Sequence, residues 1–350
     1  MNRFYMIIMA MIIVPFLHAC MTTQPVQPAK RSDPLIGKII RAETGREIDF
    51  KTLVNHISEY DVIYLSEKHD NADQHAAQQK IIRALTDLLA AEEKKPSIGF
   101  EFFAMDHTPD LLNFIDTGNA NHSQETEQMI ERSLRMKLGW YHQSDTMWQY
   151  YYDLLKTARD LNLAVAGLDL STTLKRRITR KGINGITPIE REAVFSTGLS
   201  DDIYKTYMTD ILKTVHCGMG HEKMHARLYD TWVARNDKMA HSVNRMHTHG
   251  NGPVIVIVGK GHTDYNLGMI DRLAALNPDI NQVNVGLTEI RVTPYPLSHY
   301  LAPLDLEGYP EHPKADFLWF FQRVSYADPC EKFKESLKKM KRAPESRRNR

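Results

Sequence analysis

Several features that would place a protein in a class are scarce or missing in this sequence. The formal net charge of its 350 residues is +1, so there is no domain-wide positive field, which argues against nucleic acid as the main partner. No internal repeat is evident, which excludes a repeat architecture. The only long apolar run, residues 4–17, is too short to span a bilayer comfortably.

Residues 1–19 have a basic start at Arg3, then the apolar run, and then Leu17 and Ala19 ahead of Cys20. This arrangement resembles the lipobox of a lipoprotein signal peptide, whose cleavage leaves the cysteine as an acylated N-terminus. His18 is unusual inside such a box, so an ordinary secretory signal is the alternative. We expect a lipid on Cys20 and an anchor in the membrane.

Residues 20–34 have almost nothing to bury, and we expect them to form a flexible tether between lipid and domain. Met21 stands where an aspartate would favour retention in the inner membrane. We therefore expect a cell-envelope protein, anchored in the outer membrane and facing the periplasm. Besides Cys20, only Cys217 and Cys330 are present, and in an oxidising compartment they could either pair or stay free.

Between Asp61 and His262, short apolar runs alternate with longer amphipathic stretches. This alternation predicts an α/β fold with a mostly parallel central sheet flanked by helices and carrying a helical insertion. Predicted strands are 62–65, 98–100, 163–168 and 253–258, with later strands at 282–290 and 317–323. Predicted helices are 72–92, 109–116, 123–138 and 144–160, and only helices are expected over 171–249, the longest at 226–246.

One domain is expected over residues 35–305, followed by a C-terminal extension over 306–350. The last twenty residues hold nine Lys or Arg and three Glu. Such a run is usually a solvated helix or tail, and a contact with a membrane surface is the alternative.

Four predicted strands are each followed by polar residues at the carboxyl end: 67–70, Glu101, Asp169 and 260–262. In an open parallel sheet these ends share one edge, where such folds bind ligands. Each cluster alone has a structural explanation, such as Asp70 capping a helix or Glu67 pairing with a lysine. The repetition at one edge predicts a common crevice.

The segment 258–268 follows the last of these strands, and its glycines permit a tight turn with backbone close to a ligand. A phosphate loop is a weak alternative, because the Gly-to-Gly-Lys-Ser/Thr spacing is missing. Four ordered segments, 66–71, 99–103, 235–240 and 259–273, resemble the motifs of the ChaN-like haem-binding lipoproteins, a family similar in fold to the erythromycin esterase and Tiki group. Ser66 departs from the usual glycine, and Asn236 separates Arg235 from Asp237, which are usually adjacent.

The resemblance implies a haem cofactor, with a tyrosine on iron and a His and a Lys of a partner subunit on the propionates of a homodimer. A ferric ion favours a hard phenolate, and cationic donors suit carboxylates. We assign Tyr265 as the iron ligand, since it follows His262 by three residues. The predicted propionate contacts and other cofactor-binding residues at the same edge are Lys260, His262, Lys68, His69, Glu67 and Glu101.

Three alternatives stay open. His221 and His225, four residues apart on a helix, would face the same way and could ligate the metal instead; a surface histidine pair is their plainer explanation. Alternatively, Glu67, His69, Glu101 and His262 could bind a divalent metal or perform acid/base hydrolysis. Finally, the same acids and imidazoles could form a buried polar network that binds no ligand.

Overall fold

The structure is a computed structural model that describes residues 31–118, 123–199, 202–331 and 334. Its centre is an eight-stranded sheet in the order β2-β1-β8-β7-β3-β6-β4-β5. The strands are β1 (Ile39–Arg41), β2 (Arg46–Ile48), β3 (Val62–Glu67), β4 (Ser97–Ala104), β5 (Val165–Asp169), β6 (Val254–Gly259), β7 (Gln282–Glu289) and β8 (Phe317–Phe321). From β8 to β5 all neighbours are parallel, while β1 and β2 pair antiparallel at one edge.

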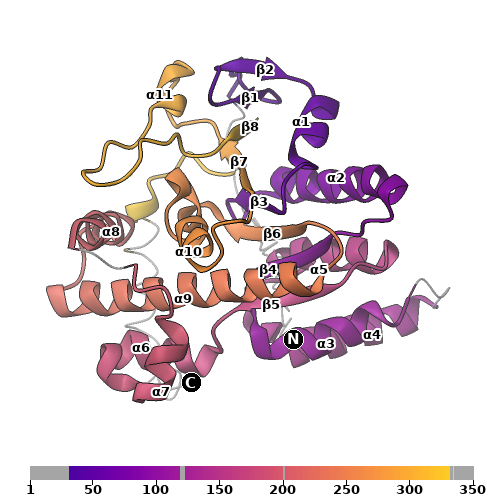
Figure 1. Ribbon diagram of the computed structural model, residues 1–350, viewed down its shortest axis with the longest axis horizontal. Helices are drawn as coiled ribbons and strands as arrows, with labels where there is room; N and C mark the ends of the chain where they lie inside the picture. Colours follow the sequence, from indigo (N-terminus) through magenta and orange to yellow (C-terminus); the bar gives the residue numbers. More distant parts are fainter. Residues whose placement is uncertain (1–30, 119–122, 200–201, 332–333, 335–350) are drawn as a thin grey trace, which may run out of the picture.

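Helices cover both faces of this sheet (Figure 1). They are α1 (Phe50–Ile57), α2 (Ala72–Leu89), α3 (Thr108–Ile115), α4 (Gln124–Lys137), α5 (Asp145–Asp160), α6 (Thr172–Lys181), α7 (Pro188–Val194), α8 (Asp202–Val215), α9 (Glu222–His249), α10 (Met269–Leu276) and α11 (Ser298–Leu301). The predicted α/β class is therefore confirmed. No helix in the described part of the chain is long and apolar enough to cross a membrane.

Side chains that alternate along β3 build two separate cores. Ile63 and Leu65 pack with α1, α2 and α5 on one face, whereas Val62 and Tyr64 pack with α9 and α10 on the other. This alternation follows from the two-residue period of a strand. Because both faces are covered, β3 and β6 are buried along their whole length, which explains their continuous apolar runs.

Side-chain caps set the start of several helices. The side chain of Asn71 accepts from the backbone N–H groups of Asp73 and Gln74 at the start of α2, and Ser144 caps α5 in the same way. Such caps satisfy N–H groups that have no partner inside the helix. They fix where α2 begins, and with it the turn that carries the polar residues after β3.

Several predicted boundaries need correction. The predicted helix 226–246 extends to Glu222–His249, and the predicted strand 163–168 begins at Val165 and ends at Asp169. Strands β1 and β2 and helix α1 precede Asp61, where no element is predicted. Strand β8, inside the predicted C-terminal extension, pairs with β1 and β7, so the sheet continues beyond residue 305. Cys20, the signal peptide and most of the basic tail lie outside the described residues.

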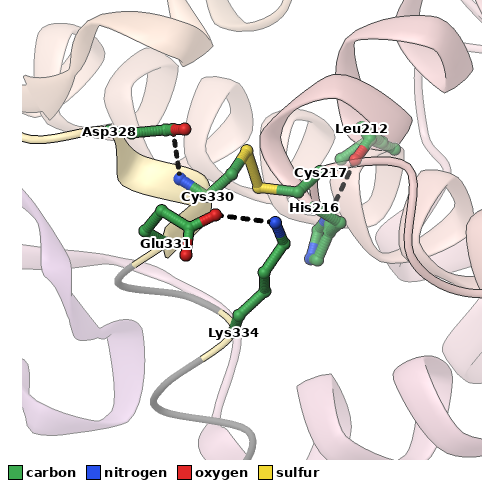
Figure 2. Close-up of a disulfide and its surroundings, with 7 residues drawn as sticks. All are labelled: Leu212, His216, Cys217, Asp328, Cys330, Glu331 and Lys334. Carbon is green, nitrogen blue, oxygen red and sulfur yellow. Dashed lines mark hydrogen bonds and ion pairs between the residues drawn. A yellow bond between two sulfur atoms is a disulfide. The ribbon is translucent and has the colours of Figure 1, made fainter.

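Cys217 and Cys330 form a disulfide, with 5.5 Å between their Cα atoms and a sequence separation of 113 (Figure 2). The bond joins the turn between α8 and α9 to the segment after β8. Helices α6, α7 and α8 gather along the same part of α9 in Figure 1. The disulfide therefore fastens the C-terminal segment to the helical insertion.

Candidate functional site

Glu67, the last residue of β3, lies buried at the centre of a polar cluster. Its Oε1 accepts from the hydroxyl of Tyr151 and lies 3.1 Å from Nδ1 of His69. Its Oε2 accepts from Nε2 of Gln78 at 2.7 Å and lies 3.2 Å from Nδ1 of His75. Burial and the Glu67 charge raise the pKa of Tyr151 well above its usual value, so this phenol stays protonated and donates. Both oxygens of Glu67 are thus occupied by protein groups.

Glu101 lies within β4, and not after it as predicted. The ladder between β4 and β6 ends at Phe100, and the register of β4 against β5 shifts beyond that residue, so Glu101 is the first side chain past the ladder. Its Oε1 lies 2.7 Å from Nη2 of Arg235 and 3.2 Å from Nε2 of His262. Its Oε2 accepts the backbone N–H of Gly259 at 2.5 Å. Burial disfavours the ionised carboxylate of Glu101. His262 and Arg235 outweigh this effect and hold the pKa of Glu101 well below its usual range.

Arg235 of α9 joins Glu101 to Asp169, the last residue of β5. Its Nε donates to Oδ2 of Asp169 at 2.9 Å, and Lys175 donates to the same oxygen at 2.7 Å. Asp169 is fully buried, and buried charges are tolerated when they are paired in this way. The fold therefore brings the carboxyl ends of β4 and β5 together through one guanidinium.

Three side chains contact the imidazole of His262. Its ring stacks on Trp232 with 4.2 Å between centroids and 10° between planes. Its Nδ1 lies 2.7 Å from Oδ1 of Asn236, and its Nε2 faces Glu101. Burial lowers the pKa of His262 although the Glu101 charge opposes this. Asn236, which separates Arg235 from Asp237 in the sequence, thus has a specific role in orienting this imidazole.

His69 stands at the exposed side of the same cluster, with 38% of its side chain accessible. Its ring meets Phe102 edge to face at 4.4 Å. Burial disfavours the imidazolium, but the hydrogen bond to Glu67 and the charge of Glu101 outweigh it and raise the pKa of His69. A Cβ on Gly259 would lie 2.5 Å from Cε1 of His69, so only glycine leaves room for this ring.

The structure thus brings Glu67, His69, Glu101 and His262 together, as predicted. Within the described residues, however, no group of three or more His, Cys, Asp or Glu side chains is placed to hold a metal ion. The predicted divalent-metal version of the hydrolase hypothesis has no support in this arrangement. The lone pairs of Glu67 already have protein donors, which also disfavours it as a general base.

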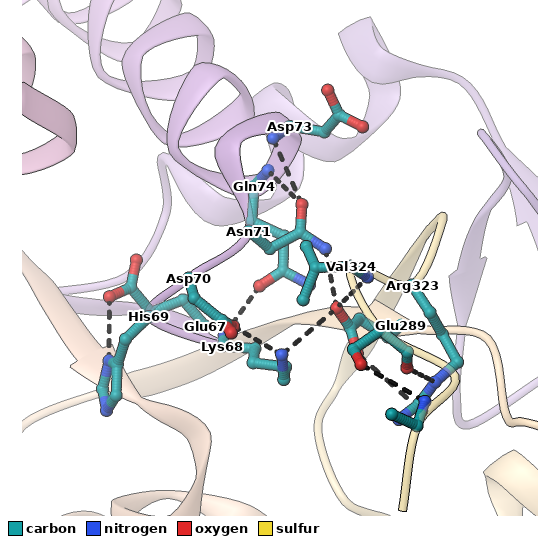
Figure 3. Close-up of polar contacts among 12 residues, drawn as sticks. Glu67, Lys68, His69, Asp70, Asn71, Asp73, Gln74, Glu289, Arg323 and Val324 are labelled. Atoms are coloured by element: carbon teal, nitrogen blue, oxygen red, sulfur yellow. Dashed lines mark hydrogen bonds and ion pairs between the residues drawn. The ribbon is translucent and has the colours of Figure 1, made fainter. Parts of the chain in front are cut away.

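A second buried carboxylate, Glu289, lies at the carboxyl end of β7 and contacts Lys68 and Asn71 (Figure 3). Oε1 of Glu289 accepts from Nδ2 of Asn71 and from the backbone N–H of Val324, both at 3.0 Å. It also lies 3.6 Å from Nζ of Lys68, which forms an ion pair with Asp70 as well. The side chain of Lys68 is about one third exposed.

Lys260 follows β6 and is half-buried beside a cavity of about 490 Å³ that Glu289 also lines. Burial lowers the pKa of Lys260, and the nearby charges of Lys314 and Arg323 act in the same direction. Lys260 is therefore near the polar cluster in sequence but faces different neighbours from His262.

Tyr265 has φ 63° and ψ 24°, in the left-handed region that non-glycine residues seldom adopt. Its N–H donates to the carbonyl of Lys314 at 3.1 Å, and Nζ of Lys314 lies 5.3 Å from its ring centre. The half-buried ring packs beside Tyr207, Leu267 and their neighbours. Tyr265 thus lies on the same loop as His262 but outside the Glu67–Glu101 cluster.

His221 and His225 lie four residues apart at the start of α9. His221 is the N-cap of α9 with extended backbone, and its Nδ1 accepts from the N–H of Met224 at 3.2 Å. His225 is buried inside the helix while His221 is exposed. The surface-pair explanation is therefore wrong for His225. Both residues line one surface pocket beside Gly220, and their role as metal ligands stays a prediction.

Sequence reasoning missed three residues of the site. Glu289 ends a predicted strand, and the rule applied to the other strand ends would have found it. Tyr151 and Gln78 project from helices α5 and α2 toward Glu67. No local signal distinguishes them from the other polar residues of those helices, because their role depends on how the helices dock.

A sequence profile of the family described as "Haem-binding uptake, Tiki superfamily, ChaN" matches residues 53–273, more than half of the chain. A search of the curated proteins finds no match. Among solved structures, "Cofacial heme binding to ChaN of Campylobacter jejuni" is similar with a TM-score of 0.59 at 18% identity, covering 80% of this chain and 95% of that one. A mutant of erythromycin esterase EreC in its open conformation reaches a TM-score of 0.38 at 14% identity, covering 79% of this chain and 83% of that one.

The fold and the family profile define an α/β protein of the haem-binding uptake class. The chain belongs to the ChaN family of the Tiki superfamily, and haem is the cofactor of that family. The donor chemistry of the site fits such a ligand, because an imidazole, an ammonium group and an aromatic ring are partly exposed after β3 and within β4. They belong to His69, Lys68 and Phe102, which we call the rim residues.

Proposed function

We propose that this protein is a lipid-anchored haem-binding protein of the cell envelope that takes part in haem or iron uptake. The family membership supports the haem ligand. The observation that carries the proposal to this chain is the set of rim residues, which are partly exposed after β3 and within β4. It combines two cationic side chains, a flat aromatic surface and buried carboxylates that hold the imidazole in place.

The cationic side chains suit the propionates of haem. Hydrogen bonding to Glu67 favours the charged form of His69, and a charge-assisted bond to a carboxylate is stronger than a neutral one. Lys68, the preceding residue, adds an ammonium group near Glu289, and Lys260 and His262 are the further propionate candidates. Glu67 and Glu101 act indirectly, since they orient His69 and His262 and need not touch the ligand.

Tyr265 is our proposed iron ligand. A phenolate is a hard donor that suits ferric iron, and the Tyr265 ring is partly exposed on the loop after His262. Nζ of Lys314 lies 5.3 Å from the centre of this ring. Bound haem would supply the iron that the protein carries.

The proposal includes a lipid on Cys20, attachment to the outer membrane facing the periplasm, and a homodimer on haem binding. A flat apolar ligand at an open rim needs a second surface to cover it. The disulfide between Cys217 and Cys330 fits an oxidising compartment. No nucleic acid partner is proposed, because the net charge is only +1.

Hemin titration of the full-length chain tests the proposal. We expect a shift of the Soret band that saturates with hemin, together with a shift toward dimer in size-exclusion chromatography. A spectrum that stays that of free hemin, with the protein still monomeric, would contradict the proposal. The variant Lys68→Met should weaken hemin binding, whereas Lys51→Met, an exposed lysine on α1 away from the rim residues, should not.

A further inference from the structure

The cavity beside Lys260 has a charge balance that goes beyond the haem proposal, which uses only Lys260 of its four cations. It measures about 490 Å³, lies at the carboxyl ends of β6 and β7, and extends along β8. Four cationic side chains and two carboxylates line it: Lys260, Arg291, Lys314, Arg323, Asp264 and Glu289. The lining therefore carries an excess of positive charge.

Two of the four cations already have carboxylate partners. Nζ of Lys314 lies 3.3 Å from Oδ2 of Asp264. Nη1 of Arg323 lies 3.8 Å from Oε2 of Glu289 and donates to the carbonyl of Ile290 at 3.2 Å. These pairs neutralise both carboxylates of the cavity wall.

The other two cations of the cavity wall are Lys260 and Arg291. Among the described residues, neither side chain forms an ion pair or a side-chain hydrogen bond. Lys260 is half-buried, and its burial outweighs the nearby carboxylates of Asp264 and Glu289 and lowers its pKa, with Lys314 and Arg323 acting in the same direction as burial. A buried or crowded ammonium group is stabilised by an anion close to it.

Two tyrosine rings lie close to the guanidinium of Arg291. Its guanidinium lies 4.9 Å from the ring centre of Tyr295 and 5.8 Å from that of Tyr300. Its own backbone N–H donates to the hydroxyl of Tyr300 at 2.8 Å. Contacts of this kind orient the planar guanidinium of Arg291. A guanidinium can bind a carboxylate through two parallel hydrogen bonds.

We propose that this cavity binds a small organic dianion with two separated carboxylates, one on Arg291 and the other on Lys260. Its volume falls in the range of small-molecule pockets, about 300–1,000 Å³, and exceeds the needs of a single inorganic anion. Between the charged residues, Val292, Ala315 and Leu318 supply apolar lining for a short hydrocarbon spacer.

Calorimetric titration of the full-length chain without hemin tests this site. Dicarboxylates of increasing chain length are compared with acetate and with inorganic phosphate. We expect saturable binding of at least one dicarboxylate, tighter than either comparison ligand. Equal affinity for acetate, tighter binding of phosphate, or no saturable heat up to about 10 mM dicarboxylate would overturn the proposal.

Arg291→Gln is the decisive variant, because Arg291 is exposed and has no part in the proposed haem contacts. We expect it to weaken dicarboxylate binding by about tenfold or more, since a hydrogen bond to a charged group is lost. Lys260→Met should do the same, whereas Lys51→Met on α1 should leave the affinity unchanged. An unchanged affinity of Arg291→Gln for the dicarboxylate would contradict the proposed site. Hemin titration of the same variant tests the haem proposal separately.

Discussion

Oε1 of Glu101 lies 2.7 Å from Nη2 of Arg235, although 134 residues separate the two in sequence. The guanidinium also reaches Asp169, so a residue of α9 connects the ends of two parallel strands. Glu101 in turn contacts His262 and the backbone of Gly259. This relationship fixes the relative positions of β4, β5, β6 and α9 at the edge of the sheet where the site lies.

Glu101→Gln should lower the free energy of unfolding by about 3 kcal/mol, because it removes one charge from a buried ion pair. Since the pKa of Glu101 is depressed in the folded state, its contribution is present above its unfolded value near 4.5 and is lost as the pH falls through the folded value. Urea unfolding at several pH values measures both effects. The matched control is Glu92→Gln, in an exposed pair with Lys94, and a loss as small as the control's would contradict the role of Glu101.

His69→Gln should show the opposite pH dependence. The pKa of His69 is raised on folding, so its contribution to stability is fully present below the unfolded value near 6.5 and is lost as the pH rises through the folded value. The difference in urea midpoint between wild type and variant should therefore shrink from about pH 5 to about pH 9. His142→Gln, at an exposed position, is the control. A difference that grows with pH would show that Glu67 does not favour the charged imidazole.

Gly259→Ala should displace the ring of His69, since the new Cβ would lie 2.5 Å from Cε1 and 2.7 Å from Nε2. Overpacking of this kind costs about 1–3 kcal/mol, and the moved imidazole should weaken hemin binding. Gly261→Ala is a matched control two residues away, because its nearest neighbour is Trp232 at 3.5 Å, an ordinary contact. Hemin titration and urea unfolding of both variants provide the test, and equal behaviour would argue against His69 as a haem contact.

Tyr265→Phe should change the visible spectrum of the hemin complex, because the variant retains the ring and lacks the oxygen donor. Charge-transfer bands of a ferric phenolate should disappear while the protein stays folded. Tyr141→Phe, which removes the hydroxyl from an exposed tyrosine, should leave the spectrum unchanged. A Tyr265→Phe spectrum identical to that of the wild type would direct the search to another tyrosine.

Removing the Cys217–Cys330 disulfide should lower the free energy of unfolding by about 4 kcal/mol, because the bond closes a long loop. The double variant Cys217→Ser/Cys330→Ser and reduction of the wild type should give similar losses in urea unfolding. Reductant should have no effect on the double variant, which serves as the control. A wild-type protein that alkylates fully without prior reduction would contradict the bond itself.

Local patterns predicted the strands β3 to β8, since their apolar runs are short, rich in β-branched residues and bounded by turns. The positions of Glu67, Asp169 and His262 followed from the strand ends, because parallel strands share a carboxyl edge. Strands β1 and β2, each three residues long, were missed. Segments that short carry too few residues to show a period, and β1 is stabilised by its pairing with β8.

The sequence by itself determined the α/β class, the buried strands and the polar residues at their ends, because side-chain period and turn chemistry are local properties. Only the tertiary structure decided which of those residues meet. The strand order β8-β7-β3-β6-β4-β5 places Glu289 beside Lys68. The packing of α5 on the sheet places the hydroxyl of Tyr151 against Glu67. Those contacts join residues far apart in the chain, and their geometry depends on how helices pack on the sheet, which no local pattern records.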